Sequence, residues 1–360
     1  MTPDAFIHSL KPSPQPVAPS PAIAPASHLR HVLRVWPFLL VALASVLVVP
    51  RTPLRVLGPL TVALLLGMAF RATAVARATP RPSVAWLSRD VLRAGVVLVG
   101  ARLDWVLLAQ AGAAPIVVAL TAVVVGLSVF AALLKALGVP RRLGALIAIG
   151  SSVCGAAAIT AARPVVGATD EEANIGIATV SVLGALASLG LVIGHSFGWL
   201  TERTYGLLAG GALHEVAHVM AAATAAPGAL ALATVTKLAR VALLPVALLA
   251  MPWLTGKDAQ GKRVPFRMPG LVIGFLVASA LATLLSHVGL GPAAASVWSA
   301  ASKVIAQAAL LMLASAMVAI GALVDWASLR RAGARPLGMA AAGALVLGAV
   351  VLGVALFLAR

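Results

Sequence analysis

The chain has 360 residues, of which 61% are hydrophobic and only 10% are charged. Soluble domains carry roughly 25% charged residues, so this composition excludes a solvated globular protein and indicates an integral membrane protein. The formal net charge of +17 does not indicate nucleic-acid binding, because the basic residues lie mostly in short gaps between apolar runs. The single cysteine, Cys154, excludes an internal disulfide.

Residues 1–29 are rich in proline, alanine and serine and contain no continuous apolar stretch. This composition predicts a disordered N-terminal tail rather than a cleaved signal peptide. Residues 30–360 are predicted to form a single transmembrane domain, and the repeat and the buried polar groups described below indicate that it is the domain of a transporter.

A helix needs about 20 mainly apolar residues to cross a bilayer, and about eleven such segments follow one another along the chain. We therefore predict an all-α polytopic membrane protein with about eleven transmembrane helices. The predicted spans are 36–50, 55–70, 83–103, 113–137, 143–164, 173–194, 204–224, 229–252, 269–287, 298–323 and 336–358.

The distribution of lysine and arginine predicts the orientation of these spans. With the N-terminus in the cytoplasm, alternate loops carry a clear excess of basic residues, as cytoplasmic loops do. Arg141 and Arg203 are expected on this inner side. Arg163 and the acidic stretch ATDEEAN, residues 168–174, are expected on the outer side.

Two stretches of the sequence resemble each other. GARLDWVLLAQAGAAP begins at Gly100 and GALVDWASLRRAGARP begins at Gly321, and nine of their sixteen positions match without gaps. The matches include Asp104–Trp105 with Asp325–Trp326, Gly112 with Gly333, and Pro115 with Pro336. Seven predicted spans separate the copies, and an odd number predicts an inverted repeat, which is typical of secondary transporters. The alternative is that Asp-Trp merely suits a helix end at the membrane interface.

The fifth predicted span, which contains IGSSVCGAAAITAARP, is not expected to be a smooth helix. Gly150, Ser151, Ser152, Gly155 and Pro164 interrupt it. A broken helix is tolerated in a membrane only where it is buried in protein or lines a cavity. The free N–H groups of a half-helix, together with serine hydroxyls, suit an anion. The alternative is ordinary glycine and serine packing between helices.

Charged and titratable residues lie in the seventh and eighth spans. His214, Glu215 and His218 belong to the seventh, and Lys237 and Arg240 lie three residues apart on one helix face of the eighth. Charges at membrane depth are usually paired and functional, so Glu215 is expected to pair with one of the two cations. The alternatives are a purely structural ion pair or snorkelling of the cations to the headgroups.

The motif HEVAH, residues 214–218, also matches the H-E-x-x-H zinc signature. An intramembrane zinc metallopeptidase is therefore the alternative function, with Glu215 as its general base. A third protein ligand is required, and no acidic motif or histidine in another span supplies one. We accordingly predict no metal site, no cofactor and no enzymatic activity.

Three stretches carry a resemblance to a known family: SSVCGAAAITAARPVV, HEVAHVMAAA followed by TKLARVALLP, and AIGALVDWASLRRAGARPL. They resemble the bacterial sulfate-exporter family of membrane proteins over roughly residues 90–355. That family usually has glutamine at the position of His218, which implies that this histidine is not an obligate metal ligand.

The family is in turn similar to the sodium/proton antiporter and bile-acid symporter superfamily. This similarity implies inverted repeats of about five helices and two discontinuous helices that cross at the site. SSVCG resembles one crossing point, and its partner is expected in the seventh span or in the tenth, around Ser302 and Lys303. The linear count makes the fifth and seventh spans parallel, which does not fit a simple inverted pair.

The resulting prediction is a secondary transporter of the bacterial cytoplasmic membrane for a small anion. Sulfate export is implied by the resemblance alone, and an organic sulfonate or carboxylate is an alternative cargo. Substrate binding is assigned to Ser151, Ser152, Cys154, Gly155, Lys237 and Arg240, and coupling to a proton or sodium ion to His214, Glu215 and His218. No G-x-x-x-x-G-K-[ST] motif is present, so a gradient is expected to drive transport. A homo-oligomer is left open.

Overall fold

The structure is a computed structural model, and it describes residues 25–223, 225–255, 268–288, 292–324 and 333–359. Throughout these residues every regular element is helical and none is a strand, which confirms the predicted all-α class. The first helix begins at Pro25, inside the tail that was predicted over residues 1–29, and the rest of that tail lies outside the described residues.

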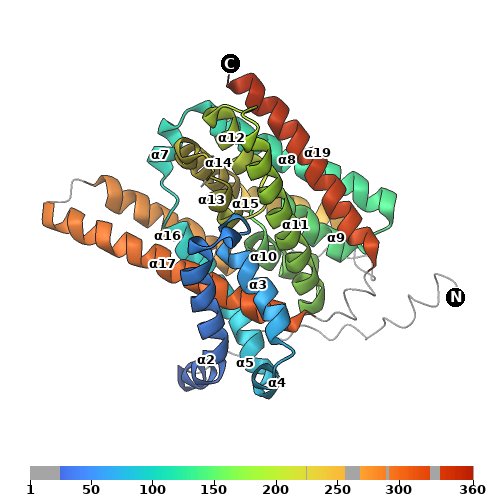
Figure 1. Ribbon diagram of the computed structural model, residues 1–360, viewed down its shortest axis with the longest axis vertical. Helices are drawn as coiled ribbons and strands as arrows, with labels where there is room; N and C mark the ends of the chain where they lie inside the picture. The colour runs from blue at the N-terminus through green and yellow to red at the C-terminus, as the bar shows by residue number, and fades with distance from the viewer. Residues whose placement is uncertain (1–24, 224, 256–267, 289–291, 325–332, 360) are drawn as a thin grey trace.

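Figure 1 shows the arrangement of the helices. In chain order they are α2 (Pro25–Val48), η1 (Val49–Arg51), η2 (Pro53–Val56), α3 (Pro59–Phe70), α4 (Ala74–Ala78), α5 (Arg81–Trp86), η3 (Leu87–Val91), α6 (Leu92–Gly100), α7 (Trp105–Gln110), α8 (Ala113–Leu137), α9 (Arg141–Ser152), α10 (Ala156–Val166), α11 (Asp170–Ser196), α12 (Glu202–Ala212), α13 (Val216–Ala223), η4 (Pro227–Ala229), α14 (Leu230–Ala242), α15 (Leu244–Thr255), α16 (Gly270–His287), α17 (Pro292–Leu323) and α19 (Ala334–Leu358).

Six of the described helices are long and apolar enough to cross a membrane, and the pair α14–α15, bent by 41°, makes a seventh. The six are 31–51, 113–137, 170–196, 270–287, 294–323 and 334–358. The expected spans 55–70 and 83–103 correspond to shorter helical pieces, the second of which contains the π-helical turn η3. Among the described residues, fewer helices than the predicted eleven are long and apolar enough to cross a membrane. The short helical pieces at 55–70 and 83–103 explain part of the difference.

The predicted fifth span is a hairpin rather than a crossing helix. Leu143, near the start of α9, and Ile159 of α10 both lie beside Gly176 of α11, where an added Cβ would be within 4 Å of each. In one straight helix these two residues would be about 24 Å apart, at 1.5 Å of rise per residue. The chain therefore turns after Ser152 and returns alongside α9. We call residues 141–166 hairpin 1.

The predicted seventh span is a hairpin as well, and we call residues 202–223 hairpin 2. The hydroxyl of Tyr205, in the first turn of α12, donates a hydrogen bond of 2.8 Å to the carbonyl of Ala222, in the last turn of α13. A straight helix would separate these residues by about 25 Å. The start of α12 and the end of α13 therefore lie at the same end of the molecule.

The direction of the following helix agrees with a hairpin. Gly206 of α12 packs against Ala229, and Gly210 packs against Ala233 of α14. The contacts advance by the same number of residues along both helices, so α12 and α14 run parallel. Two successive parallel helices require the intervening α13 to run backwards.

The two hairpins enter from opposite ends of α11. This helix begins at Asp170, directly after hairpin 1, and ends at Ser196, directly before hairpin 2. It has 27 residues, or about 40 Å of helix, which is enough to cross a bilayer. The tips nevertheless meet, because Lys237 of α14 donates hydrogen bonds to the carbonyls of Val153 in hairpin 1 and Leu213 in hairpin 2.

This arrangement corrects several sequence-based expectations. The fifth and seventh predicted spans are hairpins that enter from opposite ends of the molecule. They are therefore not parallel spans, and their opposed directions are compatible with an inverted pair. Arg163 and the stretch 168–174 lie at the same end of the molecule as Arg141, and Arg203 lies at the other end. The tenth predicted span is an unbroken helix, α17, so the region around Lys303 is not a crossing point.

The two copies of the predicted repeat lead into helices with matching starts. Both α8 and α19 have 25 residues and follow a glycine of similar conformation, Gly112 with φ 81° and ψ −170° and Gly333 with φ 75° and ψ −175°. Pro115 and Pro336 are each the third residue of their helix, and both are buried. The Asp-Trp pair of the second copy, residues 325–326, lies outside the described residues. An inverted relation between whole repeats stays a prediction.

The helices form two bundles. One contains α2, α3, α5, α6, α16 and α17, which pack on one another. The other contains both hairpins together with α8, α11, α14, α15 and α19. In Figure 1, α16 and α17 extend sideways from the rest of the molecule as a long arm. The hairpin bundle places the tips of the two hairpins inside protein, as broken helices in a membrane require.

Candidate functional site

The structure brings the sequence-predicted site residues together at the two hairpin tips and buries all of them. Apart from the glycine, each of the predicted site residues is at most 7% exposed. They are Ser151, Ser152, Cys154, His214, Glu215, His218, Lys237 and Arg240, with Gly155 among them. The site is therefore closed to both ends of the molecule in this conformation.

The tip of hairpin 1 requires glycine for two reasons. Gly155 adopts φ 72° and ψ −130°, a backbone conformation that residues with a Cβ rarely adopt. A Cβ at this position would also collide with the side chain of Glu215 from hairpin 2. The glycine thus allows the chain to reverse and lets the two tips approach each other.

Arg240 binds the carbonyl ends of both hairpins. Its guanidinium donates five hydrogen bonds of 2.7–3.3 Å to backbone carbonyls. The acceptors are Ser151 and Ser152 at the end of α9 and Gly210, Gly211 and Leu213 at the end of α12. Both of these helix ends carry partial negative charge, roughly half an electron each, and unpaired carbonyls. The buried arginine therefore satisfies the main chain of two broken helices at once.

Lys237 has the same role one helical turn away. Its ammonium group donates to the carbonyls of Val153, Leu213 and His214 at distances of 2.7–2.8 Å. An ammonium group has three N–H bonds, so all of its donors are used. Lys237 therefore has no free N–H with which to contact a substrate in this conformation.

Glu215 does not form the ion pair that the sequence predicted. Its Oε1 accepts a hydrogen bond of 2.7 Å from the hydroxyl of Ser181 on α11, and its Oε2 has no partner. The expected partners, Lys237 and Arg240, are bound to backbone carbonyls instead, because two converging helix ends present more acceptors than one carboxylate. The expected direct pairing is therefore wrong in this structure, although the charges are neighbours.

Several polar atoms at the tips have no hydrogen-bond partner. They are Oγ of Ser151 and Ser152, both ring nitrogens of His214, Oε2 of Glu215 and Nδ1 of His218. Buried polar atoms without partners each cost about 1–3 kcal/mol and are uncommon in folded proteins. Such a group of atoms indicates a place where a ligand, an ion or water completes the hydrogen bonding.

His218 connects the hairpin bundle to the other bundle. Its Nε2 is 2.6 Å from the Oγ1 of Thr61 on α3. The carbonyl of His218 also accepts a hydrogen bond of 3.2 Å from the hydroxyl of Ser188 on α11. A glutamine at this position would offer an amide donor and acceptor to the same hydroxyl.

The geometry does not support zinc. His214 and Glu215 lie in the turn before α13, which begins at Val216, so the two histidines are not on one continuous helix. No group of three or more histidine, cysteine or acidic side chains is arranged to hold a metal ion among the described residues. The metallopeptidase alternative therefore has no supporting geometry.

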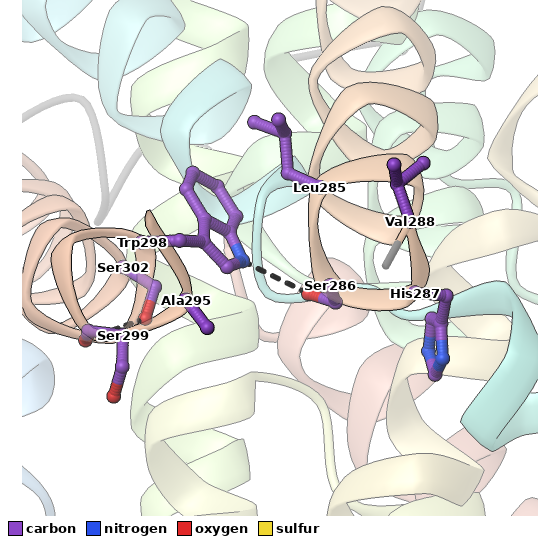
Figure 2. Close-up of a pocket in the computed structure, with 8 residues that line it drawn as sticks. All are labelled: Leu285, Ser286, His287, Val288, Ala295, Trp298, Ser299 and Ser302. Carbon is purple, nitrogen blue, oxygen red and sulfur yellow. Dashed lines mark hydrogen bonds between the residues drawn. The ribbon is translucent and has the colours of Figure 1, made fainter. Parts of the chain in front are cut away.

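A cavity of about 560 Å³ lies away from the hairpin tips, between the ends of α16 and α17. Figure 2 shows the indole of Trp298 reaching across to Ser286, and the two form a hydrogen bond of 3.0 Å. The hydroxyl of Ser302 donates to the carbonyl of Ser299. The polar groups of this cavity are thus largely paired with each other, unlike those at the tips.

Two residues that contact the site, Ser181 and Thr61, were not predicted from the sequence. Each is a small hydroxyl residue in an apolar helix, where such residues commonly serve helix packing. Ser181 and Ser188 lie seven residues apart, on one face of α11, and both face hairpin 2. That spacing is a sequence signal for Ser181, although it is weak in a chain rich in small residues, and no comparable signal points to Thr61.

Comparison with known proteins agrees with the resemblance. The family described as conserved hypothetical protein 698 matches residues 36–340. A UPF0324 membrane protein of Bacillus cereus is 35% identical over 309 residues, which cover 82% of this chain and 86% of that one. Another, from Lactobacillus johnsonii, is 32% identical over 320 residues, covering 84% and 90%.

No solved structure matches the chain significantly. The family match extends over most of the chain and includes both hairpins and α14, so the tips belong to the shared region. The chain is therefore a member of the UPF0324 family of membrane proteins, as the three stretches predicted.

Proposed function

We propose that the protein is a secondary transporter that carries a small anion through a site between the tips of hairpins 1 and 2. The observation that carries this proposal is the meeting of two opposed hairpins at a buried group of unpartnered polar atoms. Broken helices that meet near the middle of a membrane protein are typical of secondary transporters. A purely structural centre would instead be expected to pair its polar atoms.

The anion is proposed to contact the unpartnered hydroxyls of Ser151 and Ser152, with the backbone of Cys154 and Gly155 close by. Both hydroxyls are donors, which suits an oxyanion such as sulfate, a sulfonate or a carboxylate. Lys237 and Arg240 supply positive charge within the site while remaining bound to the hairpin carbonyls. Their role is thus to hold the tips and to set the sign of the local potential.

Coupling is proposed to involve Glu215 and His214, with His218 linking their movement to α3. Glu215 has one free carboxyl oxygen, and His214 has two free ring nitrogens, so both can take up a proton. A sodium ion bound at the free carboxyl oxygen is the alternative. Exchange of a proton or sodium ion at this position would change the charge that the anion meets.

Transport is proposed to occur by movement of the hairpin bundle against the bundle that contains α3, α6 and α17. The closed tips represent an intermediate in which the site is open to neither side. The protein is proposed to lie in the bacterial cytoplasmic membrane with its N-terminus in the cytoplasm, because basic residues dominate that end. No ATP-binding motif is present in the sequence, which favours a gradient as the driving force.

Uptake into proteoliposomes tests the proposal. Radiolabelled sulfate, a small sulfonate and a small carboxylate are offered under an imposed pH gradient, an imposed sodium gradient and no gradient. At least one anion should accumulate under one gradient, and accumulation should stop when that gradient is dissipated with an ionophore. Equal uptake in protein-free liposomes for all three anion classes would contradict an anion transporter.

A further inference from the structure

A second cavity, of about 250 Å³, lies at the end of the molecule where hairpin 2 enters. It is formed between the segment after α6 and one side of α14. Leu238, which directly follows Lys237, is one of its walls. The cavity therefore lies next to the helix that holds the hairpin tips, while remaining distinct from the tips themselves.

Arg102 is the positive group of this cavity, and it is half-buried. Its Nη1 and Nη2 atoms lie 3.7 Å from the sulfur of Met220 on α13, which is a weak acceptor. No carboxylate among the described residues lies within ion-pair distance of it. A half-buried guanidinium with so few partners is a strong binding group for an anion.

The one acid in the cavity wall, Asp104, is bound elsewhere. Its Oδ1 accepts hydrogen bonds from the backbone N–H groups of Val106 and Leu107 and so caps the start of α7. Its Oδ2 pairs with Nε2 of His287 at 2.8 Å. Asp104 is only two residues from Arg102, yet both of its carboxylate oxygens are engaged by these partners, and the two residues form no ion pair with each other.

The rest of the wall is apolar, except for Thr234, whose hydroxyl donates to its own helix. The apolar residues are Leu103, Leu107, Leu108, Ala231, Val235 and Leu238. Drug-sized molecules occupy pockets of about 300–1,000 Å³, so this smaller cavity suits a compact molecule such as one with a single ring. A positive group opposite an apolar wall favours a molecule that has both a negative group and an apolar part.

We propose that this cavity binds a small organic anion, with its sulfonate or carboxylate group on Arg102 and its apolar part against the leucines. Its position beside hairpin 2 makes it a vestibule from which the anion passes to the tips. Only this onward step rests on the proposed function, because binding at Arg102 requires no transport. The proposed cargo is then an organic anion with an apolar part rather than any small anion.

Equilibrium binding of benzenesulfonate tests the proposal. The full chain is placed in nanodiscs of phosphatidylcholine, and binding is measured by titration calorimetry without any gradient. Arg102→Gln should weaken binding at least tenfold, and so should Ala231→Phe, which fills the cavity without changing its charge. Arg55→Gln removes an exposed arginine that does not line the cavity and should leave binding unchanged. Thermal unfolding of each variant in the same nanodiscs checks that the fold is retained.

Three outcomes would overturn the proposal. The first is unchanged binding in Arg102→Gln or in Ala231→Phe when both variants are folded. The second is binding of inorganic sulfate as tight as that of benzenesulfonate, because sulfate has no apolar part. The third concerns an anionic lipid as the natural occupant. If phosphatidylglycerol is retained in an Arg102-dependent manner while benzenesulfonate does not bind in phosphatidylcholine, the site belongs to a lipid headgroup.

Discussion

The two sides of the hairpin junction are both buried, yet they differ in how their polar groups are satisfied. On one side, Lys237 and Arg240 use their donors on eight hydrogen bonds to backbone carbonyls. On the other side, Glu215 makes one side-chain hydrogen bond and the ring of His214 makes none. We call these the paired side and the unpaired side of the junction.

The difference separates two uses of buried polarity. Charges that neutralise helix ends stabilise a fold, and removing one leaves several buried carbonyls without a donor. Polar atoms without partners destabilise the empty site. Such atoms are expected where a bound ligand or ion supplies the missing hydrogen bonds. The paired side is therefore expected to determine stability, and the unpaired side is expected to determine transport.

The largest loss of stability is expected from Arg240→Met, on the paired side. It removes five hydrogen bonds at once and leaves the ends of α9 and α12 with unpaired carbonyls. We expect a loss of more than about 3 kcal/mol, or a failure to fold. Thermal unfolding in detergent measures it, with Arg55→Gln as a control for the loss of an exposed arginine. An unfolding free energy within about 1 kcal/mol of the wild-type value would refute the structural role of Arg240.

The next largest effect is expected from the double variant Glu215→Gln with Lys237→Met. If the two residues neutralised each other, the double variant would be more stable than Lys237→Met alone. Because Lys237 is bound to carbonyls rather than to the carboxylate, the double variant should instead be no more stable than Lys237→Met alone. A double-mutant cycle of unfolding free energies measures the coupling. A higher unfolding free energy for the double variant than for Lys237→Met alone would support the ion pair that the sequence predicted.

Glu215→Gln alone should separate stability from transport. Its amide oxygen can still accept the hydrogen bond from Ser181, so the unfolding free energy should change by no more than about 1 kcal/mol. Gradient-driven uptake should be lost, since an amide does not take up a proton and has no negative charge to attract a sodium ion. Ser181→Ala is the matched control, because it removes the hydrogen bond and keeps the carboxylate. Normal driven uptake by Glu215→Gln would exclude the coupling role.

The smallest effect is expected from His218→Gln. The glutamine amide can maintain the hydrogen bond to Thr61, so stability should change by less than about 1 kcal/mol and uptake should persist. The purified wild type should also contain no stoichiometric zinc by elemental analysis. Zinc near one equivalent that disappears in His218→Gln would instead support the metallopeptidase.

The sequence indicated the membrane class and the positions of the polar residues, because apolar runs and rare buried charges are local signals. It did not indicate the hairpins. A segment of 20 to 26 small and apolar residues has the same composition whether it crosses a bilayer or turns back at a glycine. The placement expected for Arg163 and Arg203 relative to Arg141 was wrong for this reason, because each hairpin changes the count of crossings by one.

The partners of the polar residues were also beyond the sequence. Glu215 was assigned to a cation because opposite charges in neighbouring helices attract, and backbone carbonyls carry no signal in a sequence. Only the structure shows that the ends of α9 and α12 converge on Lys237 and Arg240. In the same way, the pairing of Asp104 with His287 across 183 positions explains why Arg102 is left without an acid.

The opposed hairpins are the central claim, and cysteine labelling tests them most directly. In a Cys154→Ala background, single cysteines are placed at Arg142 and Ala168, at the two ends of hairpin 1, and at Arg203 and Ala225, at the two ends of hairpin 2. A membrane-impermeant maleimide is then applied to intact cells and to inverted vesicles. Cysteines 142 and 168 should label from one side of the membrane, and cysteines 203 and 225 from the other. Labelling of the two positions of either pair from opposite sides would contradict the hairpins and the site built on them.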